Sequence, residues 1–558
     1  MTAAAPARTP AAPARRAAAA AVVCLGLFML GLDLTVLNVA VPDLQGGLDT
    51  STAQVQWIVD GYALVLGGTV LAVGAFTDAW GRRRSFVCGV AVCAGASLGG
   101  ALSAQPWQVI TARCTMGAGA ALLMPATLAV LHHLFPEARL RSRAIAAWAA
   151  VGGMGGLCGP VIGGWLVEHF SWRAAFWINL PLAAVIIVLA LLLVPESHAR
   201  RRAGFDVPGA ALSAAGLLVL VWSITESPHR GWTSPAALTG FAAAALLLAA
   251  FVRRQLHTPA PMLPLSLLRV PAIGVAAVAL ALMSFAMFGA LFVLTLYLQG
   301  VLGFSPLQAG LRTLPLPAGL ALGAGCAVPV RARLGGRVPV VGGLALVTVG
   351  FAILATTTPD SDYPHCAAFQ LVAGFGAGLV AAAATESVMG SVATERAGLG
   401  SAINDATRQV GSALGVAVQG SLLAAVFTSR LTASLTDLHA PAPVAAAARH
   451  SMLSVPAQAM RLPGPLRSSV LSAARRAFTD AMTLTAVVAG AVTLLTAAAA
   501  ARWLGRPDRR TARPGPAVPG STDRSRRPGK RSVRRYRAIS HSFRGAFMTR
   551  AGGDGRRQ

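Results

Sequence analysis

The stretch GAFTDAWGRRR, residues 74–84, joins two apolar runs, at 54–76 and 85–104. Each run has about 20 residues, the length that an α-helix needs to cross the ~30 Å hydrocarbon core of a bilayer. The consecutive arginines Arg82–Arg84 are too costly to place in lipid and mark a loop in water. The stretch therefore predicts two membrane-spanning helices joined by a short basic loop.

The same pattern repeats along most of the chain. Only 12% of the 558 residues are charged, against about 25% in a soluble protein, and the mean hydropathy is +0.63. Because the apolar runs lack the strict alternation of barrel strands, we predict an all-α integral membrane protein. About fourteen spans are expected, at 18–41, 54–76, 85–104, 107–131, 143–167, 174–194, 207–226, 235–252, 271–299, 307–329, 338–357, 365–391, 399–427 and 480–503.

The loop arginines set the expected orientation. With the N-terminus inside, alternate loops bring one set of cations to the same side, whereas the opposite loops carry few cations and several acids such as Asp43 and Asp360. This asymmetry follows the positive-inside rule and predicts that both termini are cytoplasmic. The cations are Arg82–Arg84, Arg139, Arg141, Arg143, Arg200–Arg202, Arg253, Arg254, Arg331, Arg333 and Arg337.

The spans and loops divide the chain into parts. We expect a long outside segment at 429–479, interpreted as a surface loop with a short amphipathic helix near 466–478. The tail carries much of the net charge of +27 and is expected to be disordered. The parts are a cytoplasmic N-terminus at 1–17, a six-helix bundle at 18–195, an inserted helix pair at 196–256, a second six-helix bundle at 257–503 that includes the outside segment, and a basic cytoplasmic tail at 504–558.

The composition argues against several classes of protein. A basic tail beside a membrane helix is typical of cytoplasmic retention or of lipid headgroup contact, so no nucleic-acid partner is expected. The seven cysteines lie singly, without metal-ligand spacing. Neither a nucleophile constellation nor a nucleotide loop is apparent, so we expect no enzyme, no metal and no cofactor. Arginine replaces lysine almost throughout, which with the high alanine content suggests a high-GC bacterium.

Residues 74–84 resemble the loop 2–3 signature of the major facilitator superfamily, G-x-L-x-D-R-x-G-R-[KR]. The resemblance implies a cytoplasmic gate, with Gly74 for close helix approach, Asp78 as a charge latch, Gly81 for a tight turn, and Arg82 and Arg83 on the cytoplasmic side. Phe76 and Ala79 depart from the pattern, which shortens the charge network. The alternative is that the arginines only anchor the loop.

The fifth span contains GGMGGLCGPVIGG, residues 152–164. Small residues four apart allow close helix packing. The segment resembles the antiporter signature of the same superfamily, G-x-x-x-G-P-x-x-G-G, which is typical of exporters. Packing alone would also explain the glycines. The signature residues are Gly155, Gly159, Pro160, Gly163 and Gly164.

Two further elements narrow the resemblance. The run LDLTVLNVAVP, residues 32–42, is similar to the first-helix element of the fourteen-helix drug:H⁺ antiporter branch. Residues 57–62 in the second span and 171–181 at the start of the sixth continue this likeness. Arg113, with Gly117 and Gly119, resembles the R-x-x-x-G-x-G element, whose arginine is assigned in relatives to proton transfer or to tuning a nearby carboxylate. Because an arginine within a span costs at least ~2.5–3.5 kcal/mol at the bilayer centre, we expect it to face a polar partner. The alternative is a snorkelling arginine near the outer interface.

Carboxylates within spans are candidates for proton coupling or substrate binding. Asp60 and Glu386 could instead be solvated near an interface. Asp405 and Arg408, three residues apart on one helix face, could form a static ion pair or belong to the coupling site. The candidates are Asp33, Asp60, Arg113, Glu386, Asp405 and Arg408, with Trp57, Phe285, Phe288 and Tyr297 as candidate cavity aromatics whose alternative is lipid-facing packing.

Together these features predict a proton-driven exporter of drugs or of hydrophobic and cationic small molecules in the bacterial plasma membrane. The expected partners are the lipid bilayer, protons and substrate, with the proton gradient as energy source, and the protein is expected to be a monomer. The alternatives are an importer or facilitator of a small metabolite in the same fold, and a membrane enzyme or receptor. The substrate itself is not identified by the residues.

Overall fold

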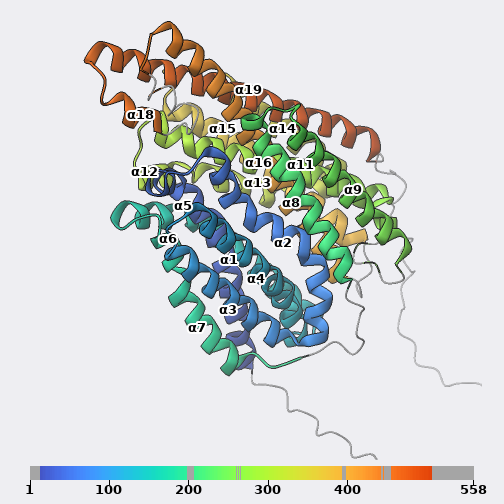
Figure 1. Cartoon of the computed structure of the whole chain (residues 1–558). Helices are drawn as coiled ribbons and strands as arrows, with labels where there is room; N and C mark the ends of the chain where they lie inside the picture. Colours follow the sequence, from blue (N-terminus) through green and yellow to red (C-terminus); the bar gives the residue numbers. More distant parts are fainter. Residues whose placement is uncertain are drawn as a thin grey trace, which may run out of the picture. The chain divides into compact units, whose positions relative to one another are not determined.

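The computed structural model describes residues 13–197, 206–258, 265–391, 397–441 and 454–504, with the single residues Pro261, Leu263 and Val444. The regular elements of these residues are helices (Figure 1). Thirteen of them are long and apolar enough to cross a membrane. The fourteenth predicted span lies in α2, Thr52–Trp80, a helix of 29 residues several of whose side chains fall outside the described part. The prediction of an all-α membrane fold is confirmed.

The N-terminal half packs around its own apolar core, built from side chains such as Leu30, Tyr62 and Phe86. Ala174–Trp177 and Asn179–Leu193 together form one span, interrupted at Ile178. The elements of this half are α1 (Pro13–Leu48), α2 (Thr52–Trp80), α3 (Arg82–Ala101), α4 (Pro106–Leu134), α5 (Ala138–His169), α6 (Ala174–Trp177) and α7 (Asn179–Leu193).

The inserted pair consists of α8 (Val207–Arg230) and α9 (Pro235–His257). Asp206 caps α8, because its Oδ1 accepts hydrogen bonds from the Gly209 amide at 3.0 Å and from Arg254 Nε at 2.6 Å. Its Oδ2 accepts one from Gln255 at 2.8 Å, which ties the start of α8 to the end of α9. The pair therefore forms a hairpin closed by one carboxylate.

Asp206 gives a first testable prediction. Burial alone would raise the pKa of this carboxyl, but the bonds from Arg254, Gly209 and Gln255 together lower it below the ordinary value. A lowered folded-state pKa means that the stabilisation is present above the unfolded pKa, ordinarily near 4, and is lost as the pH falls through the folded pKa. Asp206→Ala should lower stability by about 1–3 kcal/mol at pH 7. The thermal unfolding midpoint of the purified protein should therefore fall at pH 7, with the gap to wild type closing only in strong acid. An unchanged midpoint at pH 7 would contradict the assignment.

The C-terminal half has a separate core, which includes Leu298, Phe351 and Phe369. Pro306–Leu334 forms one span that is interrupted before Pro315, because a proline has no N–H with which to continue the helical hydrogen bonds. The elements are α10 (Leu265–Leu268), α11 (Pro271–Gly300), α12 (Pro306–Arg312), α13 (Pro315–Leu334), α14 (Arg337–Ala355), α15 (Tyr363–Ser391), α16 (Ala397–Asp437), α18 (Ser454–Ala459) and α19 (Gly464–Trp503).

The prediction of a surface loop at 429–479 is wrong for most of its described residues, whereas the short helix predicted near 466–478 lies within α19. α16 continues to Asp437 and α19 already begins at Gly464, so that each has about 40 residues and a length of roughly 60 Å, twice the hydrocarbon core. The extensions are stable as helices because they bury apolar side chains. Phe478 packs against Phe427 and Tyr297, with ring centroids 6.4 and 6.2 Å apart.

The apolar side chains on the outside of the bundle fit a lipid environment. Leu192, Leu246 and Leu495 are between 64% and 71% exposed, whereas Asp33, Asp60 and Arg113 are buried. This pattern is the reverse of a soluble protein, in which large exposed apolar patches are rare. The tail at 504–558 and the N-terminus up to residue 12 lie outside the described residues, Leu504 excepted, so the expected disorder of the tail stays a prediction.

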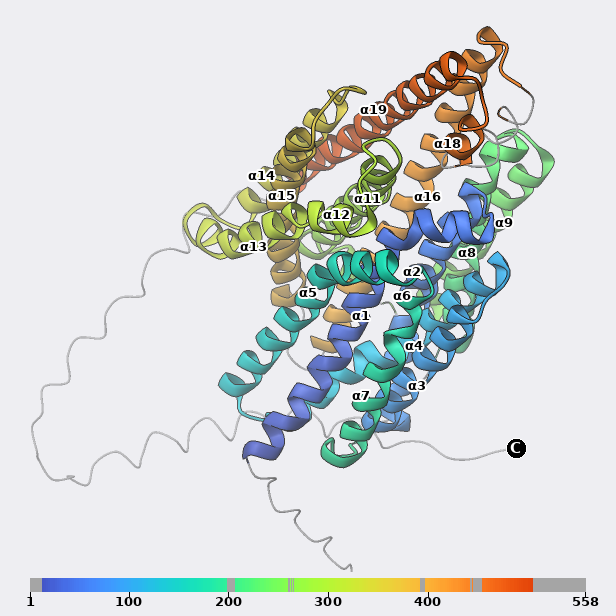
Figure 2. The ribbon, with the colours of Figure 1, turned by 90° about the vertical axis from the view of Figure 1, so that its left-hand side faces the viewer.

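The hydrogen bonds between the two halves lie away from the loop arginines. We call the junctions α2–α3, α4–α5 and α13–α14 the arginine-rich end, and the junctions α1–α2, α5–α6 and α11–α12 the opposite end. The hydrogen bonds that join described residues of the two halves come from three side chains, Gln56, Glu168 and Gln299. All three lie in the parts of their helices that approach the opposite end, where Figure 2 shows α5 and α12 side by side. The halves are therefore closed at the opposite end.

Candidate functional site

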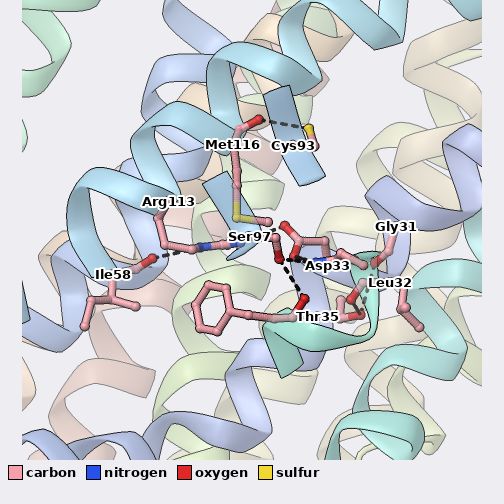
Figure 3. Close-up of polar contacts among 11 residues, drawn as sticks. Gly31, Leu32, Asp33, Thr35, Ile58, Cys93, Ser97, Arg113 and Met116 are labelled. Atoms are coloured by element: carbon pink, nitrogen blue, oxygen red, sulfur yellow. Dashed lines mark hydrogen bonds and ion pairs between the residues drawn. The ribbon is translucent and has the colours of Figure 1, made fainter. Parts of the chain in front are cut away.

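An ion pair buried between helices is the centre of the N-terminal half. Arg113 of α4 donates from Nη1 to Oδ2 of Asp33 on α1 at 2.7 Å, and the two side chains are 2% and 6% exposed (Figure 3). A guanidinium in a span is tolerable only when a partner compensates its charge. The position of Arg113 excludes the alternative of an arginine that snorkels to the interface.

Further groups hold the arginine in place. Its Nε donates to the carbonyl oxygen of Ile58 at 3.1 Å, and its guanidinium lies 4.6 Å from the centre of the Tyr62 ring. Both partners belong to α2, so the arginine links α2 to α1. Cation–π contacts of this kind gain strength where water is excluded.

The aspartate is held from the other side by two polar residues that sequence reasoning did not single out as site residues. Asn179, the first residue of α7, donates from Nδ2 to Oδ1 of Asp33 at 3.0 Å and lies 3.1 Å from Oγ of Ser97 on α3. Ser97 donates in turn to the carbonyl oxygen of Phe176 at 2.8 Å (Figure 3). In the sequence Ser97 stands out only as a polar residue in an apolar run, whereas Asn179 also lies in the stretch 171–181 that carries the family resemblance. Residues of α1, α2, α3, α4 and the span formed by α6 and α7 thus make one network around a buried carboxylate.

Asp60 is the second buried carboxylate and occupies a different environment. It is 1% exposed, and its Oδ2 has no hydrogen-bond partner among the described residues. It lines a small cavity of about 20 Å³, enough for about one water molecule. Of the two alternatives for Asp60, the structure therefore favours the buried one. The cavity is lined by Leu34, Asn38, Val59, Asp60 and Arg113 from the N-terminal half and by Phe288, Ser412 and Val416 from the C-terminal half.

The candidate cavity aromatics do not share one location. Phe288 lines the cavity beside Asp60. Trp57 packs instead on the apolar cluster between α2, α8 and α16. Tyr297 is buried against Phe478, and Phe285 is in contact with Gln419 through its carbonyl oxygen, at 2.8 Å. Only Phe288 of the four is therefore placed to meet a molecule in this cavity.

The candidates of the C-terminal half are less enclosed. Glu386 is 53% exposed and lies 3.4 Å from Arg331 at the arginine-rich end, so the structure favours the solvated alternative. Asp405 and Arg408 are half-buried on α16, and no ion pair joins the two in the part of the chain that is described. Of the two alternatives for these residues, the structure therefore does not support the static ion pair. A three-residue spacing places two side chains on one face but does not fix their rotamers.

The gate signature is only partly described. Gly74 and Asp78 belong to α2, but their surroundings fall outside the part of the chain that the structure describes. Gly81 takes φ +124°, which strongly favours glycine and turns the chain from α2 into α3. Arg82 donates to the carbonyl oxygen of Ala129 on α4 at 3.3 Å.

Glu196, three residues after the end of α7, contacts Arg83 and Arg84 of the gate signature. Its two carboxylate oxygens accept hydrogen bonds from the backbone amides of Arg83 and Arg84, at 3.1 and 3.2 Å. These amides belong to the first turn of α3, whose donors have no partner within the helix. Glu196 therefore ties the start of α3 to the segment after α7, and both belong to the N-terminal half.

The antiporter signature packs in two directions. A Cβ on Gly155 or Gly163 would collide with the backbone of α1, at Phe28 and Val36, whereas one on Gly164 would lie 2.7 Å from Cα of Leu307 on α12. Gly159 faces Thr35. Most of these glycines therefore bring α5 against α1, and the last brings it against the other half.

Pro160 leaves a carbonyl that another helix satisfies. As a proline it has no N–H, so the carbonyl oxygen of Gly156 lacks its helical donor. Thr35 Oγ1 lies 3.1 Å from that oxygen and can donate to it. Thr35 stands two residues after Asp33, so the donor that Pro160 lacks is replaced from the same turn of α1 that carries the buried aspartate.

Comparisons with known proteins agree with the family resemblance seen in the sequence. The family model described as Major Facilitator Superfamily matches residues 23–416. The chain is 32% identical over 483 residues to the tetracenomycin C resistance and export protein of Streptomyces glaucescens, covering 86% of this chain and 90% of the relative. It is 34% identical over 481 residues to the multidrug efflux pump LfrA of Mycolicibacterium smegmatis, covering 86% and 94%.

A solved structure shares the fold. A bacterial homologue of the human lysosomal transporter Spinster, in an inward-facing and occupied conformation, superposes with a TM-score of 0.60 at 17% identity. The match covers 89% of this chain and 98% of that chain. At this identity the likeness bears on the fold alone.

Proposed function

The chain belongs to the major facilitator superfamily, and we propose that it exports drugs or other hydrophobic and cationic small molecules in exchange for protons. The names of its relatives, a tetracenomycin C resistance and export protein and a multidrug efflux pump among them, support export rather than import. We place it in the bacterial plasma membrane as a monomer with both termini in the cytoplasm. The clustering of loop arginines at one end supports that orientation. The opposite end then faces outside.

The observation that carries the proposal is the contrast between two buried carboxylates. Asp33 is compensated by Arg113 and bonded to Asn179. Asp60 faces a cavity between the halves and has one oxygen without a hydrogen-bond partner among the described residues. A buried carboxylate without compensation favours the binding of a proton or a cation. Asp60 is therefore the group best placed to exchange one for the other.

The transport cycle follows from this competition. With the halves open to the cytoplasm, a cationic or amphipathic molecule would bind beside Asp60 and Phe288. The halves would then rock so that the same cavity opens outside. A proton from outside would neutralise Asp60 and release the molecule, and the proton would leave on the cytoplasmic side. Such a cycle needs no covalent chemistry and no cofactor, since the proton gradient supplies the energy.

The test is Asp60→Asn in proteoliposomes with ethidium as a fluorescent monocation. In wild type an imposed ΔpH should drive ethidium movement, and collapsing the gradient with nigericin should stop it. The variant keeps the size of the side chain but cannot release a proton, so its flux should no longer respond to ΔpH. Glu226→Gln is a matched control, because Glu226 pairs with Arg230 on its own helix. If Asp60→Asn keeps the full ΔpH response, Asp60 does not couple transport.

A further inference from the structure

One carboxylate of the N-terminal half reaches the C-terminal half. Glu168 lies in the last turn of α5, and its Oε2 accepts hydrogen bonds from Ser305 Oγ at 2.7 Å and from the backbone amide of Leu307 at 3.1 Å. Ser305 and Leu307 stand at the start of the span that contains α12. The two donors therefore come from the opposite half.

The contact completes a turn that the C-terminal half satisfies only in part by itself. Ser305 Oγ accepts from the Gln308 amide at 3.3 Å, and Gln308 Oε1 accepts from the Ser305 amide at 3.4 Å. This reciprocal arrangement uses the serine oxygen as an acceptor and leaves its hydroxyl hydrogen and the Leu307 amide to be satisfied elsewhere. Glu168 accepts both.

The backbones are already in contact beside this carboxylate. A Cβ on Gly164 would lie 2.5 Å from the carbonyl oxygen of Pro306, and a Cβ on Gly310 would collide with the backbone of Pro160. The two helices can approach this closely only because glycine stands at both crossing points. When the halves separate at this end, Glu168 must lose both of its donors together.

A contact made in one of two conformations shifts the balance between them by its full net free energy. The other hydrogen bonds between described residues of the halves come from the neutral amides of Gln56 and Gln299, at 3.4 and 3.0 Å. Hydrogen bonds to an ionised carboxylate are shorter and stronger than those between neutral groups. Glu168 therefore stabilises the closed conformation through charge-assisted hydrogen bonds, which Gln56 and Gln299 cannot form.

We propose that Glu168 is a gating residue that latches the outer ends of the two halves together while the cavity faces the cytoplasm. Among the described residues, the Glu168 carboxylate accepts hydrogen bonds only from the other half, so it serves the closure of the halves rather than the folding of its own half. The latch rests on the proposed function for the assignment of this end to the outside. It does not depend on which carboxylate carries the proton.

The experiment measures the distance between the halves directly. Spin labels at Leu102→Cys, after α3, and Asp360→Cys, between α14 and α15, report on the opposite end in a full-length protein freed of its native cysteines and placed in nanodiscs. Glu168→Ala should raise the ratio of the long-distance to the short-distance population by roughly threefold to tenfold, because exposure to water weakens a charge-assisted bond without abolishing it. Glu168→Gln should fall between this variant and wild type.

Two further variants make the result specific. Glu226→Ala removes a carboxylate whose ion pair stays within α8 and should leave the distances unchanged. Ser305→Ala should shift them in the same direction as Glu168→Ala, and the double variant should shift them by less than the sum, because both remove one contact. Glu168→Ala distances that match those of Glu226→Ala would overturn the latch. The distance measurement uses neither substrate nor ΔpH. It can therefore be interpreted even if proton-coupled export fails in the proteoliposome assay.

Discussion

Replacing Arg113 by methionine is expected to abolish ΔpH-driven transport and to lower the stability of the protein by about 3–5 kcal/mol, the range found when one partner of a buried ion pair is removed. The variant leaves Asp33 with a charge in the interior and with only Asn179 as a polar partner. It also removes the bond to the Ile58 carbonyl and the contact with Tyr62. The thermal unfolding midpoint in detergent and ethidium flux in proteoliposomes measure the two effects.

A second variant separates the structural role of the pair from its role in transport. Asp33→Asn together with Arg113→Met removes both charges and keeps an amide that can still contact Asn179. We expect this double variant to recover most of the lost stability, since replacing both partners avoids an uncompensated charge. Transport should stay at background, because the double variant still lacks the guanidinium that lines the cavity beside Asp60. A single Arg113→Met variant that transports like wild type would remove the pair from the mechanism.

Span length made most of the fold predictable. Helices in lipid must be uniformly apolar for about 20 residues, and this signal does not depend on tertiary contacts. The extension of α16 was missed, and that of α19 was predicted only as a short separate helix near 466–478, because both extensions are polar enough to contain Arg430, Arg467 and Arg475. A helix half in water carries no continuous apolar run, so it resembles a polar loop until its buried face is known.

The site was predictable residue by residue but not as an arrangement. Asp33 and Arg113 stand out because charges in spans are rare, yet they are 80 positions apart and nothing in the sequence states that they meet. Asn179 is a weaker signal, since a single amide in an apolar run is common in packing. Glu168 gave no signal, because a carboxylate at the end of a span is ordinary, and only the position of α12 shows what it binds.

Replacing Gly155 by valine is expected to disrupt the packing of α5 on α1. A Cβ at this position would collide with the carbonyl oxygen of Phe28 and lie 3.0 Å from the backbone nitrogen of Leu32. These are backbone atoms, so no side-chain rotation relieves the overlap and the two helices must move apart. Overpacking of a close interface costs about 1–3 kcal/mol and sometimes more. The midpoint of thermal unfolding should fall accordingly.

Gly153→Val is the matched control, because it changes the same residue type on the same helix while its Cβ would meet nothing within 4 Å. Differences in helix propensity therefore cancel between the two variants. Leu32 directly precedes Asp33, so a shift of α1 away from α5 also displaces the carboxylate that Arg113 binds at 2.7 Å. We accordingly expect Gly155→Val to lose ΔpH-driven flux as well as stability, and Gly153→Val to keep both. Equal behaviour of the two valine variants would show that close packing at Gly155 does not position the ion pair, and the glycines of the signature would then need another explanation.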